Sequence, residues 1–247
     1  MTASSGNGSD ICVAGHNISD VVLDEVCSII NNSKKIYLSQ IEEVAPNNQV
    51  GILFNNDDYE LAKFLNYKFD LLVEYSGEVN QVVDIIKKSF TAKKIRISLT
   101  TATVYKSAFA HIISKIISAK IPISVEKSQS ITLAIHEAVT NAVIHGNLEM
   151  HGKFTNLEGF TKYYQELERR VESTDLRLRR IEVDLWFEGE MVMVSIQNEG
   201  DGYVPKEDIV TEDSDPTGKG LGLIRSLSEK VEILDRGRKI EIGFSKV

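Results

Sequence analysis

Apolar positions in the first part of the chain come in short runs that alternate with stretches of helical spacing. The runs ICVAG, KKIYL, VGILF and FDLLVEY predict strands. Residues near 18–30, 58–65 and 78–90 repeat apolar side chains every three or four positions, which indicates helices. Strands that alternate with helices are typical of a mostly parallel sheet. We therefore predict a small α/β domain over residues 1–90.

The pattern changes near residue 93. The strand KIRISL precedes helices predicted near residues 102–119 and 125–145, and a charged helix follows near residues 157–173. The strands RIEVDLWF and MVMVSIQN then join through a tight turn, a helix begins near Gly222, and VEILD and KIEIGFS form a terminal hairpin. This order predicts an α+β domain over residues 91–247, a two-layer sandwich with helices on one face of a mostly antiparallel sheet. We place the boundary between the domains near residues 88–93.

Composition excludes several classes of function. The chain has 247 residues and a formal net charge of −8, whereas nucleic-acid binding needs clustered lysine and arginine, so we expect no nucleic-acid partner. No run of about 18 apolar residues predicts a membrane span. The two cysteines, Cys12 and Cys27, make neither a disulfide framework nor a metal set. We expect a cytoplasmic protein with reduced thiols.

The stretch HEAVTNAVIHGN aligns three polar side chains. Glu137, Asn141 and His145 are four residues apart, so they form one stripe on a helix whose other positions are largely apolar. A carboxylate and a carboxamide so placed offer oxygen ligands to Mg²⁺, which completes its shell with water and phosphate. The alternative is that this stripe is only the solvent-exposed face of an amphipathic helix. A zinc-protease helix is excluded because Thr140 stands where its second histidine would be.

Two glycine-rich segments follow. In NEGDGY, Asn198 ends an apolar strand, where its amide could bind a base edge, and Gly200 and Gly202 allow close backbone approach. A simple turn is the alternative. In TGKGLGLIRSL, glycines precede a predicted helix, whose free N–H groups would attract an anion, and Lys219 adds positive charge. This segment has neither the Walker spacing nor G-x-G-x-x-G, and a flexible hinge is its alternative.

The three segments occur in an order that resembles the ATP-binding domain of the Bergerat (GHKL) fold, which gyrase, histidine kinases and MutL share. HEAVTNAVIHGN is similar to the N box of that family, NEGDGY to its first glycine box and GKGLGL to its second. Within the family, the chain most resembles anti-sigma-factor serine/threonine kinases and related ATPases of bacterial regulators. The resemblance covers residues 93–247 and implies ATP and Mg²⁺ as cofactors.

The resemblance implies roles for individual residues. Glu137 would be the general base and Asn141 the Mg²⁺ ligand. Residues 206–216 make up a short, acidic segment, which would be a mobile lid. The remaining residues that would contact the nucleotide are His145, Gly146, Asn147, Asn198, Gly200, Gly202, Gly218, Lys219, Gly220, Leu221 and Gly222.

One position departs from the family pattern. The first glycine box usually begins with an aspartate that accepts a hydrogen bond from the adenine amino group, and this chain has Asn198. A charged hydrogen bond contributes about 1.5–3 kcal/mol and a neutral one about 1 kcal/mol. Since about 1.4 kcal/mol is a factor of ten, we expect nucleotide affinity to fall roughly tenfold and binding to survive.

Three activities fit these residues. The first is a serine/threonine kinase that uses Mg-ATP to phosphorylate a small regulator of the anti-anti-sigma kind, and that binds a sigma factor or similar target. The second is a nucleotide-binding switch without efficient phosphotransfer, which Asn198 and the acidic lid favour. The third is the ATPase part of a two-component-like system. Analogy with related kinases implies a homodimer.

Two further features bear on these alternatives. A histidine kinase needs a phosphoacceptor histidine on a helical hairpin, and the candidate, His111, has so many apolar neighbours that we interpret it as structural, on a helix packed in the domain core. The N-terminal domain loosely resembles a response-regulator receiver. It lacks the acidic residues that a receiver has after its first strand. Asn55 stands where a receiver has its aspartate, and Asp57 lies two residues further along the chain. We predict a degenerate, non-phosphorylatable receiver-like domain that docks a partner or the C-terminal ATP-binding domain.

Overall fold

The computed structural model describes residues 11–38, 40, 49–53, 69–89, 94–151, 156–202 and 216–246, with only the backbone for residues 216–219. The chain divides into two compact units, Met1–Ile97 and Ser98–Val247. The predicted helix near residues 58–65, the positions Asn55 and Asp57, Tyr203 and all of the predicted lid except Pro216 lie outside the described residues.

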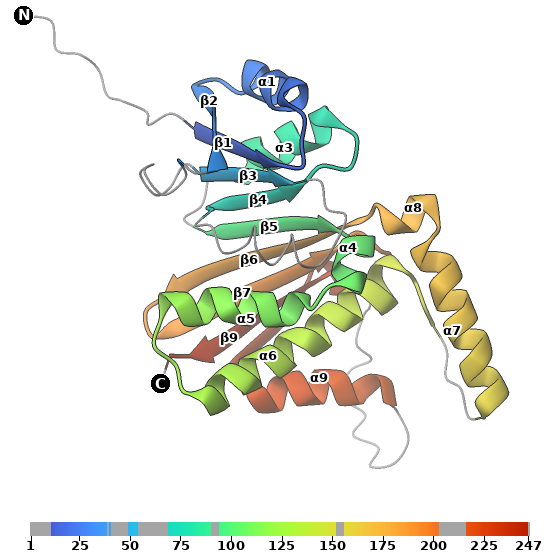
Figure 1. The fold of residues 1–247 in the computed structure, drawn as a ribbon. Coiled ribbons are helices and arrows are strands. Elements are labelled where there is room, and N and C mark those ends of the chain that lie inside the picture. The colour runs from blue at the N-terminus through green and yellow to red at the C-terminus, as the bar shows by residue number, and fades with distance from the viewer. Residues whose placement is uncertain are drawn as a thin grey trace, which may run out of the picture. The chain divides into compact units, whose positions relative to one another are not determined.

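The first unit contains a parallel sheet (Figure 1). Its strands are β1 (Ile11–His16), β2 (Ser33–Ile36), β3 (Gln49–Leu53) and β4 (Leu71–Glu74), and β1 lies between β2 and β3. Each neighbouring pair in this group runs parallel. The predicted α/β class is therefore confirmed, and the strand order begins like that of flavodoxin-like sheets.

Two described helices complete the core of this unit. They are α1 (Asp20–Ile29), whose first turn is capped by the Ser19 hydroxyl, and α3 (Val79–Ser89). Val26 from α1, Ile52 from β3 and Ile86 from α3 are all fully buried in one apolar cluster. Burial of apolar side chains from both kinds of element is the main stabilising term in such a unit.

The second unit contains an antiparallel sheet of β6 (Arg180–Glu188), β7 (Met191–Asn198), β9 (Lys239–Ser245) and β8 (Lys230–Leu234), in that order. All three pairings are antiparallel, as predicted. The turn between β6 and β7 needs Gly189, whose φ is 54°. A further strand, β5 (Ile95–Thr100), contains the point that divides the two units.

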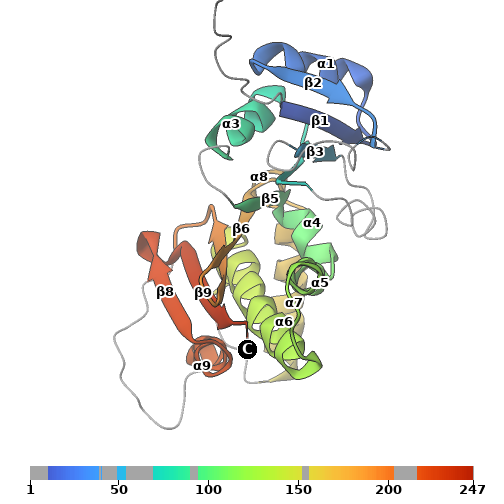
Figure 2. The same ribbon diagram turned by 90° about the vertical axis from the view of Figure 1, so that its left-hand side faces the viewer.

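Helices cover one face of this antiparallel sheet (Figure 2). They include α5 (Phe109–Lys120) and α6 (Val125–Thr140), preceded by the short α4 (Thr101–Lys106). The charged helix α7 (Leu157–Val171) and the short α8 (Thr174–Arg177) lead into β6, and α9 (Pro216–Leu227) precedes β8. The predicted two-layer sandwich is confirmed. Within the described ranges, no helix is both long and apolar enough for a membrane span.

Three predicted helix boundaries are wrong. The helix expected over residues 102–119 is two helices, because Ser107 is extended, with ψ of 156°. The helix expected to reach residue 145 stops its α-helical course at Thr140 and continues as the π-helix η2 (Asn141–Asn147). The helix expected from Gly222 begins at Pro216, a residue type that suits the first helical position.

The helix break at Ser107 also affects His111. Phe109, Ile112 and Ile113 are buried as expected, so α5 does pack in the core. His111 itself lies on the exposed side of α5, and its structural rather than catalytic role stays a prediction.

Candidate functional site

A cavity of about 250 Å³ lies within the second unit, between the end of α6, η2, the ends of β7 and β9, and α9. It brings together residues from all three motif segments. Its lining residues are Ala138, Asn141, Ala142, His145, Gly146, His151, Ile196, Asn198, Gly202, Leu221, Ile233, Gly237, Arg238, Lys239 and Ile240.

Three isoleucines from neighbouring strands line the sheet side of this cavity. Ile196 on β7 pairs with Ile240 on β9, and Ile240 pairs with Ile233 on β8. Residues paired directly across strands project from the same face of a sheet, so the three side chains form a row. Asn198 is two positions beyond Ile196 and therefore also shares this face. The result is an apolar surface with an amide at its end, which suits a flat heteroaromatic group.

Glu137 near the end of α6 and Asn141 at the start of η2 lie beside α9. A Cβ placed on Gly220 would be 3.0 Å from Glu137 Oε2 and 3.5 Å from Asn141 Nδ2. Glu137 and Asn141 are both partly exposed. Glycine at position 220 therefore leaves room for both polar groups at the contact between the helices. The structure thus places two of the motif segments next to each other.

The π-helix η2 orients the remaining N-box residues. Its wider turn is visible in the hydrogen bond from Leu148 N–H to the carbonyl of Val143, five residues earlier, at 2.8 Å. His145 Nδ1 lies 2.8 Å from the Met150 carbonyl. A carbonyl can only accept, so Nδ1 carries the hydrogen in this arrangement and Nε2 of a neutral imidazole is left as an acceptor.

Glycines allow η2 and the end of β7 to touch. A Cβ on Gly146 would be 2.5 Å from Asn198 Cγ, and a Cβ on Gly200 would be 2.2 Å from the Gly146 carbonyl oxygen. Gly202 has φ of +87°, and its Cβ would be 2.4 Å from the Arg236 carbonyl oxygen. These contacts are too short for any side chain, so only glycine allows this close packing beside the cavity at the three positions.

Asn198 is buried, and protein groups already use both ends of its amide. Its Nδ2 donates to the Arg238 carbonyl at 3.0 Å, and its Oδ1 accepts from Gly200 N–H at 3.0 Å. Each end retains one further hydrogen-bonding position. A carboxylate could not donate to Arg238, so asparagine satisfies this local network in a way that the family's usual aspartate would not.

Asn147 has a different position from the one expected for a nucleotide contact. It is fully buried and outside the cavity lining. Its Nδ2 donates to Thr101 Oγ1 at 2.8 Å and to the Arg180 carbonyl at 2.9 Å, and its Oδ1 accepts from Glu199 N–H at 2.7 Å. These bonds tie η2 to the start of α4 and to β6 and β7. We therefore correct its role to a positioning residue.

The second glycine segment is helical rather than a loop before a helix. Gly218, Lys219, Gly220, Leu221 and Gly222 all lie within α9. Leu221 lines the cavity, and a Cβ on Gly222 would meet no atom within 4 Å. The side chain of Lys219 lies outside the described part of the structure. The expected anion site at a free helix N-terminus near Gly222 is therefore absent from the described residues.

Several lining residues were missed by sequence reasoning. Lys239 begins β9 and Arg238 directly precedes it, and both bring positive charge to the cavity. Arg238 also pairs with Asp235 at 2.7 Å, and Lys239 with Glu241 at 2.6 Å. No carboxylate is among the described lining residues. The alternation of apolar and polar residues in KIEIGFS could have indicated the face that Ile240 shares with Ile196, but no spacing rule links β9 to α6.

The donor groups in the described part of the chain indicate which kind of metal site it could form. No group of three or more His, Cys, Asp or Glu side chains lies close enough to hold a metal within that part of the chain. Asn141 and the nearby Glu137 supply oxygen donors beside the cavity. This small donor set fits Mg²⁺ held jointly by protein and phosphate oxygens, and the cavity lining fits the anionic ligand that would bring it.

Comparison with known proteins adds one finding. Residues 99–244 match the family model described as a histidine kinase-like ATPase domain. That range contains every residue of the cavity and both glycine segments. No curated protein matches the chain.

Proposed function

Because the chain belongs to the histidine kinase-like ATPase domain family, we propose that it is an anti-sigma-factor-type serine/threonine kinase that uses Mg-ATP to phosphorylate a partner regulator. Family membership supports an ATP-binding regulatory domain over residues 99–244. The observation that carries the proposal is the cavity that joins Asn141, Asn198 and Leu221 from the three motif segments.

The described side chains suit defined roles toward the nucleotide. Asn198 would bind the base through its remaining acceptor and donor positions, above the isoleucine row. Asn141 would hold Mg²⁺ through its carboxamide oxygen, and Arg238 and Lys239 would favour the negative charge of the ligand. Bound Mg-ATP would supply the phosphoryl group for transfer.

The proposal assigns Glu137 the role of general base. Glu137 is partly exposed and precedes Asn141 by about one helical turn. Its Oε2 lies at the contact with Gly220 of α9. There it would accept the proton of an attacking hydroxyl from a protein substrate. Positioning and charge neutralisation supply most of the rate in such transfers.

The partner we propose is a small regulator of the anti-anti-sigma kind, with a sigma factor as the bound target and a homodimer as the assembly. A second candidate function is a nucleotide-dependent interaction switch without efficient transfer. The Asn198 network favours it, because the adenine amino group would find a neutral acceptor that Gly200 N–H already uses.

Two measurements separate these functions. Mg-ATP affinity is measured by calorimetry for the full chain and for Glu137→Gln, with Glu126→Gln, an exposed acid on the same helix, as the matched control. Phosphate transfer to candidate partner proteins is then followed with labelled ATP. We expect Glu137→Gln to bind ATP and to lose transfer by a factor of about 100 or more, the range for a general base.

Binding with no transfer in any variant would leave only the interaction switch. Absence of saturable Mg-ATP binding would contradict both functions. Equal loss of transfer in Glu126→Gln and Glu137→Gln would show that the charge of α6 matters and that the specific carboxylate of Glu137 does not.

A further inference from the structure

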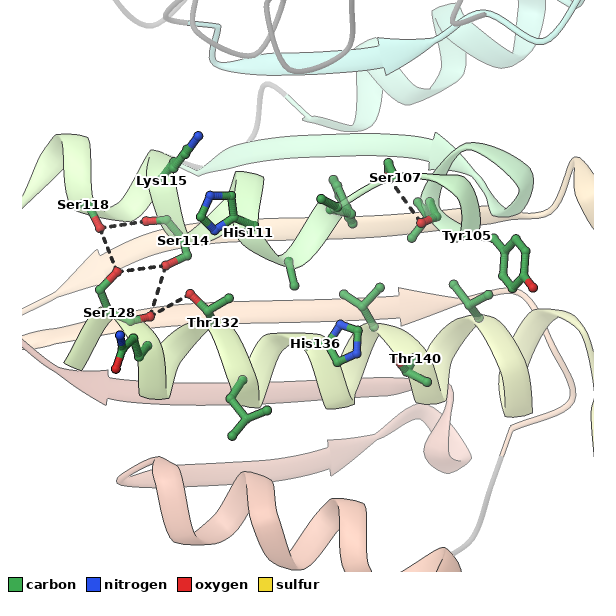
Figure 3. A pocket seen from close by; sticks show the side chains of 18 of the residues that line it. Tyr105, Ser107, His111, Ser114, Lys115, Ser118, Ser128, Thr132, His136 and Thr140 are labelled. Carbon is green, nitrogen blue, oxygen red and sulfur yellow. Dashed lines mark hydrogen bonds between the residues drawn. The ribbon is translucent and has the colours of Figure 1, made fainter. Parts of the chain in front are cut away.

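A second and larger cavity lies on the second unit, away from the nucleotide residues. It is a groove of about 700 Å³ between α5 and α6, closed at one end by α4 (Figure 3). We call it the α5–α6 groove. Its lining residues include Tyr105, His111, Lys115, Leu133, His136 and Thr140.

The groove follows one face of each helix. Along α6 the lining residues Ser128, Thr132, His136 and Thr140 recur every fourth position, so they form a continuous stripe. From Ser128 to Thr140 this stripe is about 18 Å long at 1.5 Å per residue. A site of that length suits a helix of three to four turns rather than a small metabolite.

Exposed apolar side chains line the groove. Leu133 is 43% exposed and Tyr105 37% exposed, although both are large apolar side chains. Val139 and Val143 from α6 and η2 contribute buried apolar surface beneath them. Exposed apolar groups in a cavity of this size mark a surface that binds an apolar partner face.

Serine hydroxyls connect α5 and α6 at one end of the groove. Ser114 Oγ on α5 donates to the Ser128 carbonyl on α6 at 3.3 Å, and it also lies 3.3 Å from Ser128 Oγ. Ser118 Oγ on α5 is 3.5 Å from Ser128 Oγ. Figure 3 shows these serine hydroxyls between the two helices. Helices fixed in this way offer a preformed surface, which lowers the entropic cost of docking.

The described lining of the groove has one lysine and no carboxylate, although the chain as a whole is acidic. The chain has 36 acidic residues and a net charge of −8, yet no described lining residue is Asp or Glu. Lys115 is exposed and makes no ion pair within the described part of the structure, and His111 and His136 add imidazole groups on either side. An occupant with carboxylates beside its apolar face would complement these groups.

We propose that the α5–α6 groove docks an amphipathic helical segment of a protein partner, with acidic side chains flanking its apolar stripe. Such helix-in-groove binding uses apolar anchors at positions i, i+3, i+4 and i+7. The groove and the nucleotide cavity use different faces of α6, since His136 lines the groove and Ala138 lines the cavity. The two sites have no described lining residue in common, so the docking proposal does not rest on nucleotide binding.

The test uses a displayed library of random 16-residue peptides, selected on the full chain. We expect the selected peptides to be enriched in Asp and Glu and to repeat apolar residues at helical spacing. Synthetic copies of the best peptides are then titrated by fluorescence anisotropy against variants. Lys115→Glu should weaken binding about tenfold or more, whereas Lys120→Glu, the same charge change on α5 outside the groove, should not.

Leu133→Ala tests the apolar contact, with Val125→Ala, an exposed residue of α6 outside the groove, as its control. Peptides without acidic enrichment, or binding that Lys115→Glu and Leu133→Ala leave unchanged, would overturn the proposal. Mg-ATP affinity is measured on the same variants and should not change. Loss of ATP binding with intact peptide binding would count against the proposed function alone, and the reverse result against the groove alone.

Discussion

Asn147 connects four parts of the second unit through one buried amide. Asn147→Ala would leave the buried Arg180 carbonyl and the part-buried Glu199 N–H without this partner, and a buried group that loses its partner costs about 1–3 kcal/mol. We expect the free energy of unfolding to fall by about 2–4 kcal/mol, measured by urea denaturation. Asn156→Ala, an exposed cap of α7, should cost only about 1 kcal/mol. Equal losses of unfolding free energy in the two variants would contradict the role of Asn147 in connecting these elements.

Gly220 and Gly222 offer a matched pair of substitutions on α9. Alanine should favour the helix by up to about 1 kcal/mol at either position, because glycine is a poor helix former. A Cβ at position 222 meets nothing within 4 Å, whereas at position 220 it lies 3.0 Å from Glu137 Oε2. We therefore expect Gly222→Ala to keep Mg-ATP affinity and Gly220→Ala to lower it several-fold in calorimetric titration. Unchanged affinity in both would mean that Gly220 does not border the nucleotide.

Asn198→Asp tests the departure from the family pattern. The charge should raise adenine affinity by up to tenfold, but the carboxylate would face the Arg238 carbonyl, to which the amide now donates. We expect thermal stability without nucleotide to fall, by about 1–3 kcal/mol in free energy. Asn156→Asp should be nearly neutral, since both residues cap helices well. A stable Asn198→Asp protein would show that this network is unimportant.

At the scale of elements, α7 supports the end of the N-box helix. Arg170 Nη1 donates to the carbonyls of Leu148 and Glu149, both at 2.8 Å. Glu166 orients Arg170 through a contact of 2.6 Å with its Nε, and also binds Arg169. Hydrogen bonds from Arg169 and Arg170 lower the pKa of Glu166 from 4.5 to about 2.

This pKa shift predicts how α7 responds to acid. A lowered folded-state pKa gives stability that is present above pH 4.5 and is lost as the pH falls toward 2. Glu166→Gln should therefore be less stable than the natural chain at pH 7, and the difference should shrink at pH 3. Urea midpoints at both pH values measure it, with Glu158→Gln on the same helix as the control. A difference that does not change with pH would rule out this linkage.

The elements also show what the sequence could and could not predict. Runs of apolar residues identified β7 with both of its ends, and β6 with its start and all but its last residue, Glu188. The break at Ser107 was missed because a single polar residue carries no helix-stopping signal, and the burial of Asn147 was missed because its partners are up to 52 residues away in sequence. The contact of Gly200 with Gly146 depends on the packing of η2 against the end of β7, which no local pattern encodes.

At the scale of the molecule, the two units should respond differently to nucleotide. Each unit has apolar side chains buried within it, such as Val26 in the first and Ile131 in the second. A ligand at 100 times its Kd stabilises the folded state by about 2.7 kcal/mol, and only the second unit holds the cavity. For a unit of this size, that corresponds to a rise in Tm of roughly 5–10 °C.

Differential scanning calorimetry with Val26→Ala and Ile131→Ala assigns the transitions. Both substitutions remove methyl groups from fully buried positions, so each should lower the Tm of its own unit through lost packing. Saturating Mg-ATP should raise the transition that Ile131→Ala lowers and leave the Val26→Ala transition in place. A single transition that responds to both substitutions and to nucleotide would instead mean that the units unfold together, and nucleotide binding in the second would then stabilise the whole chain.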